Sequence, residues 1–271
     1  IDRALGRIRY WHRECGLPSE TRCLLASVLI SAVEKVSNTQ GTYHDFPREF
    51  IDSRALRTIN LIPPSAKDFS GQLTVSYGKK RDTLDFVSEV PHHSVIYIDP
   101  PYNFRQYTSY YFMLNMLSEN AEIDDLDDFF ARIEFVRGQN MDDDFKSSFC
   151  SRKDFIPSLR KLISTASCDH VVLSYFDGRN HWGEFKSDSR DVSGRAELET
   201  LFRSQLFEPD SCRVIPLDRL NYQSYGGFAA SRVSEFLFIG KKSTVLRERA
   251  DSETHPWTGK DTKTQTDCVT G

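Results

Sequence analysis

The hydrophobic positions of residues 21–36 recur with the spacing of an α-helix. Seven of them fall on one face of such a helix: Leu24, Leu25, Val28, Leu29, Ala32, Val33 and Val36. The polar, glycine-containing segment 37–46 predicts a loop. A short helix is expected over 50–57, and Pro63-Pro64 ends the pattern.

Further along the chain, short apolar strands alternate with helices. Ser94–Ile98 is a continuous β-branched and aromatic run, which is typical of a strand buried on both faces. The last two strands flank Gly226-Gly227 and predict a closing β-hairpin. This alternation predicts an α/β fold with a mixed, mostly parallel sheet. The expected strands are 73–77, 94–98, 170–175, 211–217 and 235–240, and the expected helices are 82–90, 111–117, 123–136, 153–164 and 196–206.

Length and composition narrow the class of protein. The chain has 271 residues, enough for one large domain with a sizeable core. No apolar stretch approaches the roughly 20 residues that a bilayer needs, and no basic-then-apolar leader opens the chain. The six cysteines lack C-x-x-C or zinc-ligand spacing, so we expect reduced thiols in a cytoplasmic protein with no metal site. Residues 243–271 are polar and predict a disordered tail, and the initial Ile indicates a fragment or a processed product.

Charge is distributed unevenly along the chain. The net charge is −4, but residues 119–144 hold ten acidic and two basic side chains. That segment therefore carries −8 and leaves +4 on the rest of the chain. The acidic segment predicts a solvated, variable region. Binding to DNA is not excluded, because it depends on a local basic face.

The residues that carry chemistry directly follow the predicted strand 94–98. They are Asp99, Pro100, Pro101 and Tyr102, and ligands bind beyond the carboxyl ends of strands in open α/β sheets. The two prolines fix the backbone and remove two N–H donors. The Asp99 carboxylate and the Pro100 carbonyl then remain as acceptors beside an aromatic ring. This combination suits a planar base that carries an amino group.

The tetrapeptide resembles motif IV of amino-group methyltransferases that use S-adenosylmethionine. With its continuation, Asp99–Tyr111 (DPPYNFRQYTSYY) resembles the N6-adenine DNA methyltransferases of the alpha motif order. Segments 24–43, 146–153, 173–175 and 232–238 resemble further motifs of the same group, so the similarity covers residues 20–242. The subgroup usually has Asn-Tyr-His where this chain has Tyr110-Tyr111-Phe112, which leaves any polar contact there in question.

The resemblance implies a Rossmann-like class I methyltransferase sheet. It also implies a catalytic domain over 1–242, in which 104–150 is a variable, DNA-facing target-recognition region. Asp99 and Pro100 would accept both hydrogens of the adenine amine, which localises the nitrogen lone pair for attack on the sulfonium methyl group. Pro101 would hold the backbone, and Tyr102 would stack on a base that has left the duplex.

The same resemblance assigns roles outside the tetrapeptide. Asp82 and Thr83 would contact the cofactor, S-adenosylmethionine, although Asp82 equally suits the N-cap of the helix that follows. Ser174 and Tyr175 would either touch the target base or cofactor or serve only the end of a strand. The positions expected to contact DNA or substrate are Asn103, Arg105, Gln106, Tyr107, Ser174 and Tyr175.

One part of the group's pattern is missing from this sequence. The group has a Phe-x-Gly-x-Gly loop after its first strand and an acid after its second, and neither is present here. The implied strand order is 3-2-1-4-5-7-6, so strands one and two would lie between 73–77 and 94–98. Without them, 94–98 would expose an open edge with a hydrophobic flank. We expect an upstream segment of roughly 80–150 residues, or a partner chain, to supply the glycine loop.

The sequence therefore predicts an adenine-specific, site-specific DNA methyltransferase acting on double-stranded DNA. A restriction-modification system with a cognate restriction endonuclease is its expected setting. Methylation of an RNA or protein amine is one alternative, and a non-catalytic DNA-binding or regulatory remnant is another. The chain has no G-x-S-x-G, H-E-x-x-H or P-loop motif, so hydrolase, zinc-protease and NTPase functions lack support.

Overall fold

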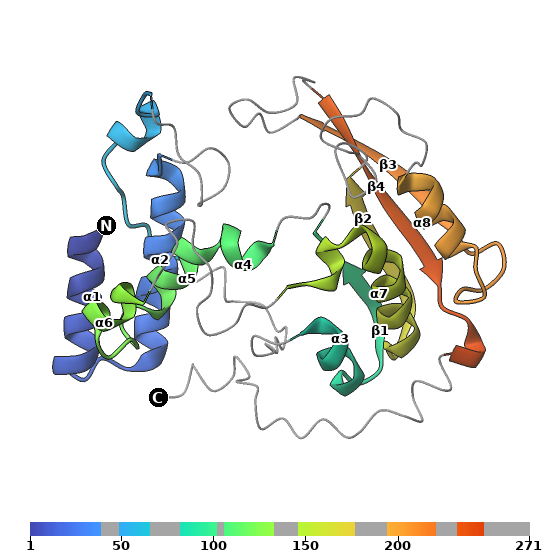
Figure 1. Ribbon diagram of the computed structural model, residues 1–271, viewed down its shortest axis with the longest axis horizontal. Coiled ribbons are helices and arrows are strands. Elements are labelled where there is room, and N and C mark those ends of the chain that lie inside the picture. The colour runs from blue at the N-terminus through green and yellow to red at the C-terminus, as the bar shows by residue number, and fades with distance from the viewer. Residues whose placement is uncertain are drawn as a thin grey trace.

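The computed structural model describes residues 1–38, 49–65, 82–101, 106–132, 146–176, 194–220 and 232–246. Two hydrophobic clusters divide these residues into a sheet lobe and a helical lobe (Figure 1). The predicted strand 73–77 and the Gly226-Gly227 turn lie outside the described residues.

The sheet has four strands: β1 (His93–Ile98), β2 (Cys168–Phe176), β3 (Arg213–Leu220) and β4 (Arg232–Lys241). Their order is β1-β2-β4-β3, with β1 and β2 parallel and β4 antiparallel to both of its neighbours. The mixed sheet with a closing antiparallel pair is thus confirmed. This order also equals the 4-5-7-6 half of the order that the resemblance implied.

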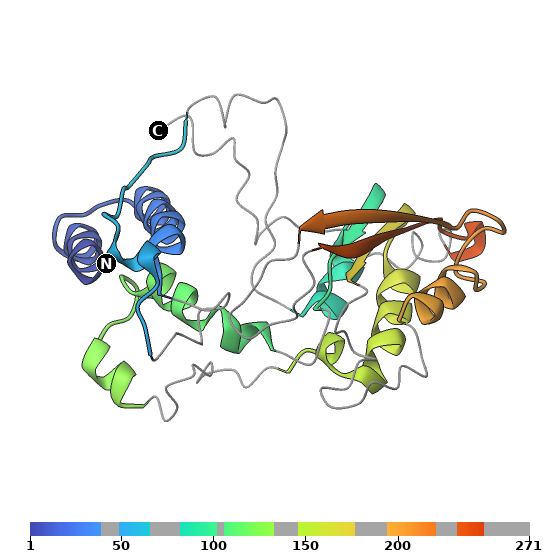
Figure 2. The same cartoon turned by 90° about the horizontal axis from the view of Figure 1, so that it is seen from above.

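Helices cover one face of this sheet and bury its core. They are α3 (Thr83–Phe86), the short 3-10 helix η3 (Val87–Glu89), α7 (Arg152–Thr165) and α8 (Gly194–Phe202). Figure 2 shows α7 and α8 side by side on the same side of β3 and β4. The apolar face of α7 predicted from the sequence is buried against alternate residues of β2 and β4. Fully buried members of this core include Phe155, Leu159, Ile163, Val171, Leu173 and Phe238.

The opposite face of the sheet remains open around β1. Val95 and Tyr97 are 52% and 61% exposed, whereas Ile98 on the covered face is buried. Burial of this strand on both faces was therefore a wrong prediction. Among the described residues β1 pairs with β2 alone, so its other edge has no strand beside it. An open edge with a hydrophobic flank is what we expect of a sheet without its first strands.

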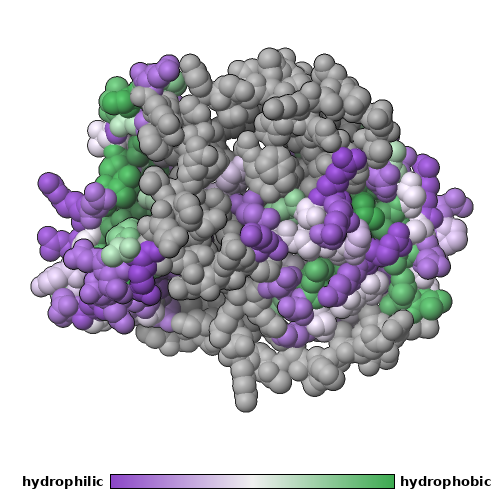
Figure 3. Space-filling view, in the orientation of Figure 1, coloured by the Kyte–Doolittle hydropathy of each residue, from purple (hydrophilic) through white to green (hydrophobic). Residues whose placement is uncertain are grey.

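The helical lobe packs around Ile8, Leu29, Val33 and Leu117. Its elements are α1 (Asp2–Glu14), α2 (Ser19–Val36), the 3-10 helix η1 (Ser53–Leu56), α4 (Tyr107–Tyr110), α5 (Phe112–Glu119) and α6 (Leu126–Ala131). Helix α2 was predicted from the sequence, whereas α1, in which only Ile8 is buried, was not. Hydrophobic side chains gather on the surface of this lobe along 50–62, and hydrophilic ones gather over α1 and α6 (Figure 3).

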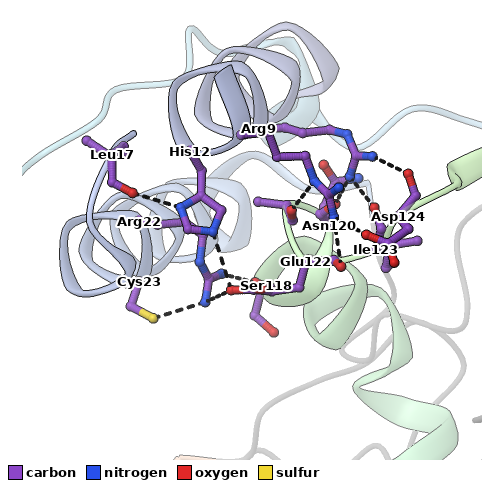
Figure 4. Close-up of polar contacts among 12 residues, drawn as sticks. Arg9, His12, Leu17, Arg22, Cys23, Ser118, Asn120, Glu122, Ile123 and Asp124 are labelled. Atoms are coloured by element: carbon purple, nitrogen blue, oxygen red, sulfur yellow. Dashed lines mark hydrogen bonds and ion pairs between the residues drawn. The ribbon is translucent and has the colours of Figure 1, made fainter. Parts of the chain in front are cut away.

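Three arginines join α1 and α2 to the end of α5 and to the turn after it, and Figure 4 labels two of them, Arg9 and Arg22. Arg9 donates to the carbonyls of Asn120 and Ile123 at 2.6 Å each, and Arg22 donates to the carbonyl of Ser118 at 2.8 Å. The third arginine, Arg13, donates to two more carbonyls of the same turn. The last carbonyls of a helix have no intrahelical donor, so cationic side chains are favourable partners there. The first part of the acidic segment is therefore anchored to the helical lobe through its backbone carbonyls, while its acidic side chains in 119–128 are exposed, as a solvated segment requires.

Two further observations concern membrane-spanning helices and residues 243–246. No helix in the described ranges is long and apolar enough to cross a membrane. At the other end, Thr244 donates to Glu208 and Leu246 packs against the core of the sheet lobe, so 243–246 contact the domain.

Candidate active site

A cavity of about 510 Å³ lies at the carboxyl end of β1, where the chain leaves the sheet. Asp99, Pro100 and Pro101 line it directly after the strand, as the sequence predicted. Thr83 lines it from the start of α3, and Gln106 and Tyr107 line it from the start of α4. The remaining walls come from Ile96, Tyr97, Ile98, Ser147, Phe149, Cys150 and Leu162. The size suits one small organic ligand or flipped base.

The hydrogen-bond acceptors that line this cavity belong to the first two residues after β1, Asp99 and Pro100. Asp99 is exposed, and Pro100 is buried beside it. Neither proline has an N–H group, so no backbone donor at 100 or 101 competes for the Asp99 carboxylate and the Pro100 carbonyl. Tyr102, Asn103 and Arg105 lie outside the described residues.

The cofactor-contacting pair predicted at 82–83 lies at the start of α3. Asp82 is the N-cap of this helix, and its Oδ1 accepts from the Leu84 N–H at 2.8 Å. The capping alternative is therefore confirmed, and it leaves the second carboxylate oxygen for another partner. Thr83 lines the cavity next to it. Contact of Asp82 or Thr83 with a cofactor stays a prediction.

The far wall of the cavity is the 3-10 helix η4 (Ser148–Cys150) together with Ser147. Ser158 on α7 donates to Ser148 at 2.7 Å, which ties the wall to the sheet lobe. Ser147 donates its backbone N–H to Gln106 Oε1 at 2.9 Å, which ties the wall to α4. No role was predicted for Ser147 or Cys150 from the sequence, where the only signal was the resemblance of segment 146–153.

Two titratable side chains of the cavity are held neutral. Burial raises the pKa of Tyr107 to about 12, with smaller contributions from nearby Tyr111 and Asp99. Burial also raises the pKa of the Cys150 thiol to about 11. Neither group is therefore a nucleophile or a base at neutral pH. In the described ranges no three His, Cys, Asp or Glu side chains form a cluster that could hold a metal ion.

Ser174 and Tyr175 do not line this cavity. Tyr175 is 1% exposed and packs against Phe155 with ring centroids 5.5 Å apart. Ser174 points to the other face of β2, as alternation along a strand requires, and is also buried. The structure thus brings Asp99, Pro100, Gln106 and Tyr107 together but leaves this pair in the sheet.

Comparison with known proteins places the sequence around this cavity in a family. Residues 14–167, which include α2, the cavity and α7, match the D12 class N6 adenine-specific DNA methyltransferases. The chain is 25% identical over 242 residues to the Type II methyltransferase M.FokI of Planomicrobium okeanokoites, covering 89% of this chain and 33% of that protein. No solved structure matches the chain significantly.

Two more relatives also match this chain over only part of their own length. The chain is 27% identical to the Type II methyltransferase M.NlaIII of Neisseria lactamica, covering 65% of this chain and 48% of the relative. It is 32% identical to the modification methylase LlaI of Lactococcus lactis subsp. lactis, covering 58% of this chain and 23% of the relative. The chain thus spans less than half the length of each of these three relatives. Since the family match covers more than half of its residues, this chain belongs to the D12 class N6 adenine-specific DNA methyltransferase family.

Proposed function

We propose that this chain forms the base-binding and catalytic part of an enzyme that methylates the N6 amine of adenine in double-stranded DNA. The observation that carries the proposal is the pair of acceptors, Asp99 and Pro100, at the carboxyl end of β1 in a cavity of about 510 Å³. The family match supports the substrate class, because its description names adenine in DNA, and two relatives are Type II methyltransferases by name. A cognate restriction endonuclease of the same system is part of the proposal.

The chemistry assigned to the chain is the activation of a poor nucleophile. The lone pair of an adenine amine is delocalised into the ring. Asp99 and Pro100 accept the two amine hydrogens, which favours a pyramidal nitrogen with a localised lone pair. Positive charge then develops on this nitrogen as its bond to carbon forms, and the Asp99 carboxylate stabilises that charge. The bond between the donor's sulfur and the methyl carbon would break in the same step and leave a neutral thioether, and the methylated amine would release one proton to water through the adjacent Asp99 carboxylate. Tyr102 remains the predicted stacking platform for the flipped base.

The methyl donor in this proposal is S-adenosylmethionine, which supplies an electrophilic methyl group when bound. Asp82 and Thr83 would hold its adenosine end, and this fits the carboxylate oxygen that the N-cap leaves available. The chain contains no G-x-G sequence that could cradle the methionine end. We infer that another polypeptide segment, upstream or in a partner chain, adds that loop beside the open edge of β1. The exposed Val95 and Tyr97 support this placement.

The missing glycine loop also favours the second candidate, a DNA-binding remnant without catalysis. The retained Asp99 and Pro100 pair argues against it, because a decayed copy has no need of a catalytic acid. Methyl transfer to RNA or protein amines has no comparable support, because the family description names adenine in DNA.

The test follows transfer of a labelled methyl group from S-adenosylmethionine to DNA, with DNA affinity measured in parallel. We expect Asp99→Ala to lower the rate by at least about 100-fold while DNA affinity changes little, since it removes one preorganised charge-stabilising group. Asp85→Ala is the matched control, because this carboxylate lies on the exposed side of α3 and does not line the cavity. Methylation that survives Asp99→Ala would remove this residue from catalysis. DNA binding without methylation, even with the glycine loop supplied, would favour the remnant.

A further inference from the structure

Gln106 presents an amide to the cavity in a fixed orientation. It precedes α4 and shares the cavity wall with Asp99 and Pro100. Its Oε1 accepts from the backbone N–H of Ser147 at 2.9 Å. A backbone N–H can only donate, so the oxygen of the amide must face Ser147 and the nitrogen must face away from it.

The amide nitrogen of Gln106 carries two donors, and none of the residues that the structure describes accepts from them. Within the described residues, the only side-chain hydrogen bond of Gln106 is the one accepted by Oε1. The residue is half-buried, and it lies at the wall of the cavity rather than on an outer loop. A half-buried donor with no partner in the described ranges is suited to a ligand acceptor, because leaving it unpaired on binding is unfavourable.

We propose that Gln106 Nε2 donates to a ring nitrogen of the target adenine, N1 or N7, and that the Ser147 N–H sets the orientation of this amide. The inference rests on the proposed function. An adenine whose amine is held by Asp99 and Pro100 presents an unprotonated ring nitrogen on either side of that amine. Recognition of adenine needs an acceptor for the amine and a donor for the ring nitrogen, and here separate residues provide them. A base with an N–H at that ring position would point this donor at the Gln106 Nε2 donor, so the two groups could not form a hydrogen bond.

Gln106→Glu tests the donor without changing the size of the side chain. A carboxylate still accepts from Ser147 but has no N–H for the base. We expect kcat/KM on adenine-containing DNA to fall about tenfold, in line with the loss of one hydrogen bond at a discriminating site. DNA that carries 1-deazaadenine or 7-deazaadenine at the target identifies the contacted atom. Gln106→Glu should have no further effect on the analogue that lacks that nitrogen.

A pair of substitutions at Ser147 tests the orienting role. Ser147 has φ −63° and ψ 128°, values that proline adopts without strain. Ser147→Pro removes the N–H that Gln106 accepts, while Ser147→Ala retains it. Both substitutions remove the hydroxyl that accepts from the Phe149 N–H at 3.3 Å, so the loss of this cap cancels in the comparison. We expect Ser147→Pro to raise KM severalfold above the value for Ser147→Ala.

The outcomes separate this inference from the proposed function. If Gln106→Glu lowers activity equally on adenine and on both analogues, the residue acts on the fold and the inference is overturned. If Gln106→Glu leaves activity unchanged while Asp99→Ala abolishes it, the inference falls and the proposed function stands. If the wild-type protein methylates no DNA under any condition, both fall together.

Discussion

The interaction between α2 and the end of α5 offers a quantitative test of how the helical lobe is held together. Arg22 is 9% exposed, donates to the Ser118 carbonyl at 2.8 Å and pairs with Glu122 at 2.9 Å. Arg22→Met keeps most of the apolar stem but removes the guanidinium. It leaves the Ser118 carbonyl without this donor at the end of α5.

The expected loss of stability follows from these two contacts. A hydrogen bond from a charged donor contributes about 1.5–3 kcal/mol. The Glu122 side chain is 52% exposed, so the ion pair is discounted for solvent screening to about 0.5–1 kcal/mol. Arg22→Met should therefore lower the free energy of unfolding by about 2–4 kcal/mol. Arg22→Lys should lose about half as much, because one ammonium cannot replace the guanidinium fork at both partners.

Urea denaturation measures the total effect, and hydrogen exchange locates it. Amide protection should fall in α5 and in 120–124, and remain unchanged in β2 and α7. The matched control is Arg203→Met, since Arg203 is 71% exposed and forms an i,i+4 pair with Glu199. This control should change stability by less than about 0.5 kcal/mol. If Arg22→Met and Arg203→Met prove equal, or if protection falls throughout the sheet, the arginines do not hold the lobe as argued.

Three further predictions concern stability and reactivity. Gly240→Ala should destabilise the protein by about 1–3 kcal/mol in denaturant melts, because the added Cβ would lie 2.6 Å from the Phe207 ring. Gly6 lies on the exposed face of α1 with open space around it, so Gly6→Ala should instead stabilise the protein by about 0.5–1 kcal/mol. Equal changes in stability for Gly240→Ala and Gly6→Ala would refute this packing argument. Asp82→Ala should cost about 1 kcal/mol through loss of the cap, and a cofactor role requires that calorimetric binding of S-adenosylmethionine also weakens. The buried Cys150 thiol should resist thiol reagents in the native state at neutral pH. Its raised pKa should also make the free energy of unfolding fall as pH rises from 9.0 to about 11, because in that range the thiol ionises only in the unfolded chain. Rapid labelling of Cys150 before unfolding would contradict its burial.

Local patterning accounts for most of the secondary structure. The helical spacing of 21–36 and of 153–164 and the apolar runs at 94–98 and 170–175 all appear as elements within a few residues of their predicted bounds. The periodicity works because each element buries a single continuous face. The prediction missed α1, although its apolar residues Ala4, Leu5 and Ile8 recur with helical spacing and pack in the helical lobe.

The tripeptide Asp99-Pro100-Pro101 and its place after a strand could be identified from the sequence alone, because the chemistry lies in contiguous residues. The sequence likewise indicated the family and the missing glycine loop. The tertiary structure decided what faces those residues. The wall at Ser147–Cys150 is more than 40 residues away along the chain, and only folding brings its N–H to Gln106. Folding also decided that Tyr175 belongs to the core and that Val95 and Tyr97 remain exposed. These outcomes depend on which elements cover each face of the sheet, and that is a property of long-range packing rather than of local sequence.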